Sequence, residues 1–321
     1  MSGVAIRPYR GLDEIPDMAA ANDRMRRHIG LLEGVDATTM AHRYTHLVNS
    51  DPLQDCLIAE RGGETVGYAR VEWHDLRDGD RLLDITLVVA PEEWESDVAG
   101  RLVAWSEGRL AGIAAGLPAR RSWFALYGFG GDAATETVAR ARGYDAVRWE
   151  AEMLRDDLLD LPELTIANGY HLRSPEGAEL PAVFDVLVSG FADAWGQYED
   201  GEHRFDAWVE DPDFRRELAV VAWHGDVPVA CVLGELHEQA DGSVRGLLAA
   251  VCTHPDHRRR GLATAAIAEC LRRLRDAGAT SAYLAADTGS EHQTLALYEG
   301  CGFRVATRST AYRKPHPGRI A

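Results

Sequence analysis

The stretch from 247 to 268, LLAAVCTHPDHRRRGLATAAIA, constrains the fold of this chain more than any other. It opens with an unbroken apolar run, 247–252, which has the length and composition of a buried strand. Pro255 ends that strand, because proline cannot donate a hydrogen bond to a sheet ladder. Alanine and leucine then recur with helical spacing, and we predict that a helix begins at Leu262. The stretch is therefore a predicted strand, turn and helix.

The predicted turn combines positive charge with small residues. It contains Arg258, Arg259, Arg260, Gly261 and Ala263. The first backbone N–H groups of a helix have no intrahelical partner, and the helix dipole adds partial positive charge there. The two small residues leave room for the backbone to approach a ligand. The turn indicates a phosphate site, and the alternative interpretation is a solvated basic turn.

Two motifs of this sequence resemble those of one enzyme family. VCTHPDHRRRGLATA, at 251–265, is similar to the acetyl-CoA signature of the GNAT superfamily of N-acetyltransferases, a strand followed by [QR]-x-x-G-x-[GA]. LYEGCGF, at 297–303, matches the second motif of that family, L-Y-E-x-x-G-F. Two motifs in the expected order are more specific than either alone. The resemblance implies direct acetyl transfer from acetyl-CoA to a nucleophile, usually an amine, without an acyl-enzyme.

The resemblance also implies which residues bind acetyl-CoA. In this family the strand before the turn splays from its neighbour, and its exposed backbone binds the pantetheine arm. That backbone corresponds here to Val251, Cys252 and Thr253. The residues expected at the pyrophosphate are Arg258, Arg259, Arg260, Gly261, Leu262, Ala263 and Thr264.

Amine attack on a thioester requires a neutral amine, a donor for the oxyanion and a proton for the departing thiolate. A backbone N–H near Val251 is expected to serve the oxyanion. Tyr298 matches the general acid of the family, and a phenol with a reference pKa of about 10 is protonated at pH 7. The alternative is a core tyrosine on an amphipathic helix.

No motif defines the general base. Family members often have a glutamate on the coenzyme strand, but 246–253 contains no carboxylate. Glu235 and His237, on the preceding predicted strand, are the candidates, and histidine titrates near neutrality. The alternatives are a solvated strand end for both residues and water as the proton carrier. Glu291 stands seven residues before Tyr298, where the family often has an asparagine that contacts the coenzyme.

The acceptor is expected to bind near FADAWGQYEDGEHRFDAW, residues 191–208, which is rich in aromatic and acidic residues. Asp193, Trp195 and Tyr198, with Glu199, are predicted to form a pocket for a cationic amine through charge and cation–π contact. The alternative is a solvent-facing helix with core aromatics.

The chain repeats one plan of elements twice. Asp-Pro at 51–52 and 211–212 precedes a predicted hairpin in each half, and Gly143-Tyr144 matches Gly302-Phe303. Mixed hairpins and helices define the α+β class. We predict two tandem GNAT-like domains, each a mixed, mostly antiparallel sheet flanked by helices. Their predicted limits are 1–158 and 166–314.

The first predicted domain departs from the second at the coenzyme turn. It has PEEWESDVAG, at 91–100, where the second has PDHRRRGLAT. Gly261 maps to Asp97 or, with a one-residue gap, to Val98, and Tyr298 maps to Ala139. Carboxylates repel a pyrophosphate. We predict that the first domain keeps the fold without binding the coenzyme.

Composition limits the class of partner. A net charge of −17 makes nucleic acid an improbable partner and suits a cationic acceptor. No apolar segment approaches the length of a membrane span, and the first residues do not form a secretory signal. We expect a cytoplasmic monomer or homodimer with no membrane partner.

Five scattered cysteines, an odd number, fit reduced and buried thiols. Cys252, His254 and His257 are too close in sequence for a tetrahedral zinc site, and no second cluster completes one. No metal is expected.

The sequence therefore favours a tandem-domain N-acetyltransferase that moves acetyl from acetyl-CoA to a small-molecule amine. Mycothiol synthase has a similar architecture and acetylates a cysteinyl amine, but the acid expected on its coenzyme strand is missing here. A non-catalytic module that binds or senses acyl-CoA is the alternative from another class. Thiol release from acetyl-CoA distinguishes the enzyme from the sensor.

Overall fold

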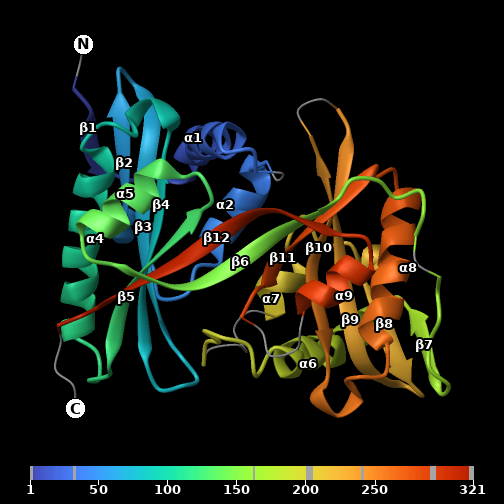
Figure 1. Ribbon diagram of the computed structural model, residues 1–321. Helices are drawn as coiled ribbons and strands as arrows, with labels where there is room; N and C mark the ends of the chain where they lie inside the picture. Colours follow the sequence, from blue (N-terminus) through green and yellow to red (C-terminus); the bar gives the residue numbers. More distant parts are fainter. Residues whose placement is uncertain are drawn as a thin grey trace. The chain divides into compact units, whose positions relative to one another are not determined.

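The computed structural model describes residues 3–31, 34–161, 163–199, 205–239, 242–289 and 294–317 (Figure 1). The chain forms two compact units. Unit 1 contains the chain up to Trp149, a short segment that begins at Tyr198, and the residues from Ser309 onward. Unit 2 contains the remaining residues from Glu150 to Arg308.

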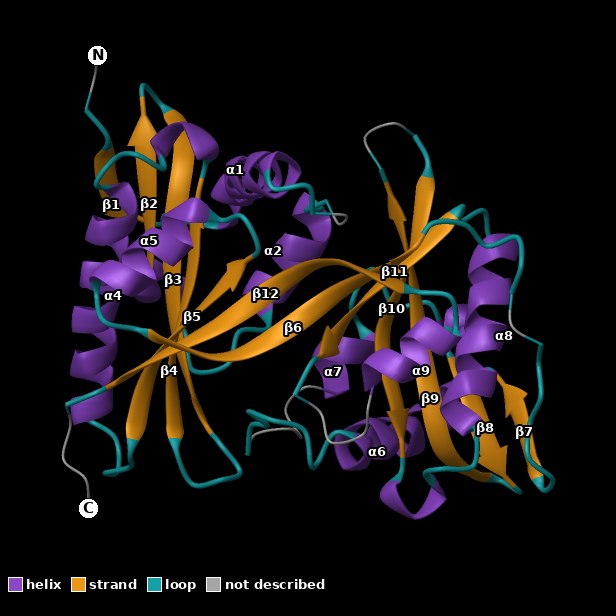
Figure 2. Cartoon of the chain, in the orientation of Figure 1, coloured by secondary structure: helices purple, strands orange, loops and turns teal. Residues whose placement is uncertain are grey.

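The sheet of unit 1 has the strand order β1-β2-β3-β4-β5-β12, in which only β4 and β5 are parallel among these neighbours. The strands are β1 (Ala5–Pro8), β2 (Cys56–Arg61), β3 (Glu64–Asp75), β4 (Arg81–Val89), β5 (Ser122–Phe129) and β12 (Arg304–Pro315). The helices are α1 (Ile15–His28), α2 (Ala37–Thr45), α3 (Pro52–Asp55), α4 (Val98–Ala115) and α5 (Ala133–Ala141). Helices cover both faces of this sheet (Figure 2). Helices α4 and α5 bury a core on one face, and α1 and α2 bury a second core on the other.

The sheet of unit 2 has the order β6-β11-β10-β9-β8-β7, in which only β10 and β11 are parallel. The strands are β6 (Asp145–Arg155), β7 (Tyr170–Arg173), β8 (Val220–His224), β9 (Val227–Glu238), β10 (Val244–Thr253) and β11 (Ser281–Asp287). The helices are α6 (Leu180–Gly190), α7 (Phe205–Val209), α8 (Leu262–Asp276) and α9 (Thr294–Gly300). Helix α8 packs on one face of this sheet and α6 on the other.

The predicted α+β class and the repeated plan are confirmed. The β2–β3 hairpin and the β8–β9 hairpin each contain one irregular step in their register. In each unit a strand then leads through a short 3-10 turn, beginning at Pro91 or Pro255, into a long helix. Helix α8 begins at Leu262, as predicted.

The last strand of each sequence half belongs to the sheet of the other unit. The β6 residues from Glu150 to Arg155 pair antiparallel with β11 in unit 2. The β12 residues from Ser309 to Pro315 pair antiparallel with β5 in unit 1. The two units are therefore not linear segments of the chain, whereas the predicted domains 1–158 and 166–314 are.

The cysteines are buried and unpaired, as expected: Cys56, Cys231, Cys252, Cys270 and Cys301. In the part of the chain that the structure describes, no helix combines the length and the apolar character that crossing a bilayer requires.

Candidate active site

The turn before α8 has an unusual backbone. Gly261, the residue before the helix, has a φ of 75°, and Arg259 has a φ of 61°. A Cβ at Gly261 would meet no atom within 4 Å, so the left-handed conformation rather than lack of space favours glycine there. A non-glycine residue with positive φ is uncommon and stores strain, which persists where the surroundings impose it.

Arg258 holds this turn in place. Its Nε donates to the carbonyl of Thr253 at 3.2 Å, and its Nη2 donates to the carbonyl of Gly190, at the end of α6, at 3.0 Å. The guanidinium also forms an ion pair with Asp193, with one N–O distance of 2.9 Å. Arg258 thus links the end of β10 to the end of α6.

Arg260 and Arg259 differ in whether their side chains have partners in the turn. Arg260 donates to the Tyr170 hydroxyl at 2.9 Å and to the carbonyl of Asp256 at 3.1 Å, so it also supports the turn. Arg259 is exposed, and no described residue forms a hydrogen bond or ion pair with its side chain. Of the three predicted phosphate-binding arginines, Arg259 has the side chain available to a ligand.

The first turn of α8 has no side-chain cap. The N–H of Ala265 donates to the carbonyl of Gly261 at 3.0 Å, which starts the hydrogen bonding of the helix. The N–H groups of Leu262, Ala263 and Thr264 precede it and have no partner within a regular helix. Free N–H groups at a helix N-terminus suit an anionic ligand.

Unit 1 has a different side chain at the position of Arg258. Trp94 Nε1 donates to the carbonyl of Val89 at 2.8 Å, the bond that corresponds to the one from Arg258 to Thr253. The alignment therefore needs no gap, and Asp97, with a φ of −83°, stands in the place of Gly261. Glu95 stands in the place of Arg259.

Strand β10 separates from β11 beside this turn. The two strands pair only from Arg245 to Leu247 in the described chain, so residues 248–253 have no partner strand on that side. The N–H of His254 donates to the carbonyl of Val229 at 2.8 Å on the other side. Since bonding alternates along an antiparallel ladder, the backbone of Val251 points away from β9 and toward the open side. This matches the splay that the family resemblance implies.

Tyr298 lies on α9 with 7% of its surface exposed. Burial raises the pKa of its phenol to about 12, so the hydroxyl stays protonated at neutral pH. No described residue hydrogen-bonds to this hydroxyl. Tyr298 packs in the same core as the apolar residues of α8, and its ring centroid lies 6.2 Å from that of Phe303.

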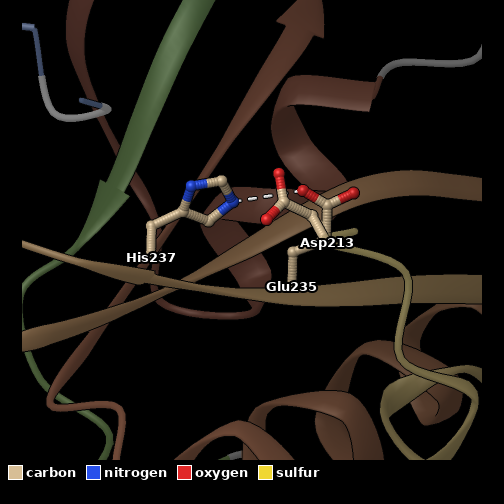
Figure 3. A group of neighbouring side chains, drawn as sticks. All are labelled: Asp213, Glu235 and His237. Carbon is tan, nitrogen blue, oxygen red and sulfur yellow. Dashed lines mark hydrogen bonds and ion pairs between the residues drawn. The ribbon is translucent and has the colours of Figure 1, made fainter. Parts of the chain in front are cut away.

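Glu235 and His237 point from the same face of β9, and their side chains are hydrogen-bonded with Oε2 and Nε2 3.1 Å apart (Figure 3). Asp213, from the loop after α7, completes the group, and the three potential ligand atoms lie within 4.8 Å of one another. The sequence analysis missed Asp213. The oxygen and imidazole donors suit a divalent cation by type, and the hydrogen-bonded pair also suits proton transfer.

The Glu-x-His pattern occurs in both units. Glu72 and His74 occupy the positions on β3 that Glu235 and His237 occupy on β9, 163 residues later. In unit 1 the Arg70 guanidinium forms an ion pair with Glu72 at 2.7 Å. This repeat was visible in the sequence once the hairpins were aligned.

The three residues predicted to bind the acceptor are not brought into one unit. Asp193, in unit 2, is paired with Arg258, and Trp195, also in unit 2, is 40% exposed. Tyr198 belongs to unit 1, where it stacks on His74 with ring centroids 4.0 Å apart.

Glu199 also belongs to unit 1 and forms an ion pair with Arg120 at 3.1 Å. Glu291, the residue at the family's asparagine position, lies outside the described residues.

A mixed sheet that opens beside a basic turn and an uncapped helix is the arrangement that the GNAT resemblance implies. Residues 180–303 match the model of the acetyltransferase (GNAT) family. No curated protein sequence matches the chain.

Solved structures extend the likeness to both units. A GCN5-related N-acetyltransferase from Sphaerobacter thermophilus is 20% identical, with a TM-score of 0.74 over 99% of this chain and 98% of its own. A tandem GNAT protein from the clavulanic acid biosynthesis pathway is 14% identical, with a TM-score of 0.70 over 99% of this chain and 100% of its own. These likenesses show the fold, and the predicted tandem GNAT architecture is confirmed.

Proposed function

We propose that this protein is an N-acetyltransferase that moves the acetyl group of acetyl-CoA directly to the amine of a small molecule. The observation that carries the proposal is the turn before α8. Two arginines support it, Arg259 is available to a ligand, and the first N–H groups of the helix are uncapped. This arrangement suits a pyrophosphate and, with the open edge of β10, an extended coenzyme.

The proposed chemistry uses three groups of unit 2. Glu235, hydrogen-bonded to His237, takes a proton from the acceptor ammonium and leaves a neutral amine. The amine nitrogen attacks the thioester carbonyl, and the N–H of Val251 stabilises the oxyanion. As the tetrahedral intermediate collapses, the C–S bond breaks and the thiolate takes the proton of Tyr298. The nitrogen then loses its remaining excess proton, which restores the Tyr298 phenol, while Glu235 releases its proton to solvent. The products are the N-acetyl amine and coenzyme A.

The wider setting remains part of the proposal. The net charge of −17 favours a cationic acceptor and disfavours nucleic acid. Five unpaired thiols suit a reducing compartment such as the cytoplasm. The proposed mechanism uses no metal, so EDTA is expected to leave thiol release from acetyl-CoA unchanged. A loss of activity with EDTA, restored by a divalent cation, would assign a metal to the Asp213, Glu235 and His237 group instead.

A charge exchange at one position tests the coenzyme site. Arg259→Glu introduces the residue that unit 1 has at the equivalent place, and it is exposed, so the fold should persist. We expect the Kd for acetyl-CoA, measured by calorimetry, to rise at least tenfold because a carboxylate then faces the pyrophosphate.

The matched control is Glu95→Gln in unit 1, which should leave this Kd unchanged. An unchanged Kd in Arg259→Glu would contradict the proposed site, and a changed Kd in Glu95→Gln would indicate coenzyme binding by unit 1. Coenzyme binding without thiol release across a panel of amines would favour a sensor over an enzyme.

A further inference from the structure

Unit 2 contains a cavity beside Glu235. Its empty volume is about 310 Å³, part of which is open to solvent. The wall is formed by α7, by the loop that follows it and by β9, and includes Trp208, Phe214, Arg215, Leu233 and Glu235. Because much of this volume is open to solvent, the enclosed part is small, and an occupant would be small and partly exposed.

One side of this cavity is apolar and aromatic. The ring centroids of Trp208 and Phe214 lie 4.7 Å apart with an interplanar angle of 55°. Leu233 is buried beneath them, and Phe184 on α6 supports the Trp208 ring from behind at 5.8 Å. Such a surface suits an aliphatic or aromatic side chain.

The polar groups of the cavity are of both signs. Glu235 and Asp211 supply carboxylates. The Arg215 guanidinium is exposed, and no described residue pairs with it. Trp208 Nε1 is buried without a hydrogen-bond partner. A buried donor without an acceptor is costly, so a ligand that supplies an oxygen acceptor there is favoured.

The cavity is adjacent to the proposed site of chemistry. Leu233 pairs with Ala250 of β10, and Glu235 pairs with Leu247. The register shifts between Leu248 and Ala250, directly before Val251. The strand segment that lines the cavity is therefore the neighbour of the backbone proposed to hold the thioester.

We propose that this cavity binds a free amino acid with an apolar side chain as the acetyl acceptor. The proposal rests on the N-acetyltransferase function proposed above. Glu235 binds the ammonium and then accepts its proton. Arg215 and Trp208 Nε1 bind the carboxylate, and the side chain of the acceptor packs on Trp208, Phe214 and Leu233. The need for a carboxylate partner distinguishes this class from simple amines and polyamines.

Matched pairs of acceptors test this class. We compare leucine with isopentylamine, and phenylalanine with phenethylamine, by thiol release from acetyl-CoA. The amine of each pair lacks only the carboxylate. We expect kcat/KM to be at least tenfold higher for the amino acid in both pairs. Arg215→Ala should raise the KM for the amino acid at least tenfold and so reduce the preference for the amino acid over the amine.

Arg216→Ala, an exposed arginine outside the cavity, is the control and should change neither value. Trp208→Phe keeps the ring but removes Nε1, and should also weaken the preference for the amino acid. Equal turnover of both members of each pair, unaffected by Arg215→Ala, overturns the amino acid proposal and leaves the N-acetyltransferase function intact.

Calorimetry with coenzyme A present separates the two proposals. Binding of leucine or phenylalanine that depends on Arg215, without thiol release, supports the cavity assignment and contradicts catalysis. Neither binding nor turnover of any of the four compounds overturns the amino acid proposal.

Discussion

At the scale of single residues, identical side chains have different tasks because of what they contact. Three arginines follow one another before α8, and the sequence assigned all three to the pyrophosphate. The structure uses Arg258 and Arg260 to support the turn, and only Arg259 has no partner among the described residues. Sequence alone could not separate them, because the partners of Arg258 are carbonyls of Thr253 and Gly190 that meet only in the folded chain.

Tyr298→Phe tests the proposed general acid. The phenol has a pKa of about 12, so it stays protonated throughout the ordinary pH range. We expect kcat to fall by roughly 100-fold, a typical loss for a positioned acid, and by the same factor from pH 6 to 9. The Kd for acetyl-CoA should not change, since the ring remains.

Tyr44→Phe is the control for removing a buried phenol. Tyr44 lies in the core of unit 1, and burial also raises the pKa of its hydroxyl. We expect its kcat to equal that of the wild type. An unchanged kcat in Tyr298→Phe would show that the tyrosine is only a core residue.

At the scale of elements, β3 and β4 of unit 1 carry a partly buried group of charges. Burial alone would raise the pKa of Glu72. The Arg70 guanidinium at 2.7 Å and the His74 ring at 3.9 Å outweigh burial and lower this pKa to about 2. Burial and the nearby charge of Glu72 raise the pKa of Asp84 to about 6. This pair of strands therefore holds one carboxylate ionised and one carboxyl protonated under mildly acidic conditions.

Asp84→Asn should stabilise unit 1 at pH 7.5. The folded state binds the Asp84 proton more tightly than the unfolded state, whose pKa is near 3.8. The stability from this group is therefore fully present below about pH 4 and is lost as the pH rises through about 6. Because part of the side chain is accessible to solvent, we expect a gain of roughly 1–2 kcal/mol.

The measurement is urea unfolding of both proteins at pH 4.5 and pH 7.5. The variant should exceed the wild type in free energy of unfolding by more at pH 7.5 than at pH 4.5. Equal unfolding midpoints for Asp84→Asn and the wild type at pH 7.5 would contradict the raised pKa. Asp78→Asn, on the turn between β3 and β4, is the control for removing one carboxylate.

The elements that the sequence predicted well are those with local causes. The start of α8 follows from Pro255, Gly261 and the apolar period after it, and the hairpins follow from glycine turns between apolar runs. Asp213 and the cavity at Trp208 were missed, because they depend on how the loop after α7 packs against β9. No local pattern encodes that contact.

At the scale of the whole molecule, the repeat and the units do not coincide. The sequence shows two consecutive copies of one plan, and that plan is confirmed. The exchange of β6 and β12 was not predicted, since a strand pattern does not specify which sheet the strand joins. Pairing partners are chosen by register and by the open edges available to them.

Cleavage of the chain between β6 and β7 tests this exchange. A protease site inserted after Leu159, which is exposed, cuts the chain without removing a strand. Each fragment still supplies one strand to the sheet formed mainly by the other. We therefore expect the cut protein to elute as one species of about 35 kDa in native size-exclusion chromatography with light scattering.

Denaturation in urea should release two fragments, which provides the control for complete cleavage. Strand pairing is cooperative with core packing. Each fragment alone should therefore be unstable, because its sheet lacks the strand that the other fragment supplies. Fragments that separate under native conditions and remain folded would contradict the exchange and favour two linear domains. Retained acetyl-CoA binding in the cut complex would show that the site of unit 2 does not need a continuous chain.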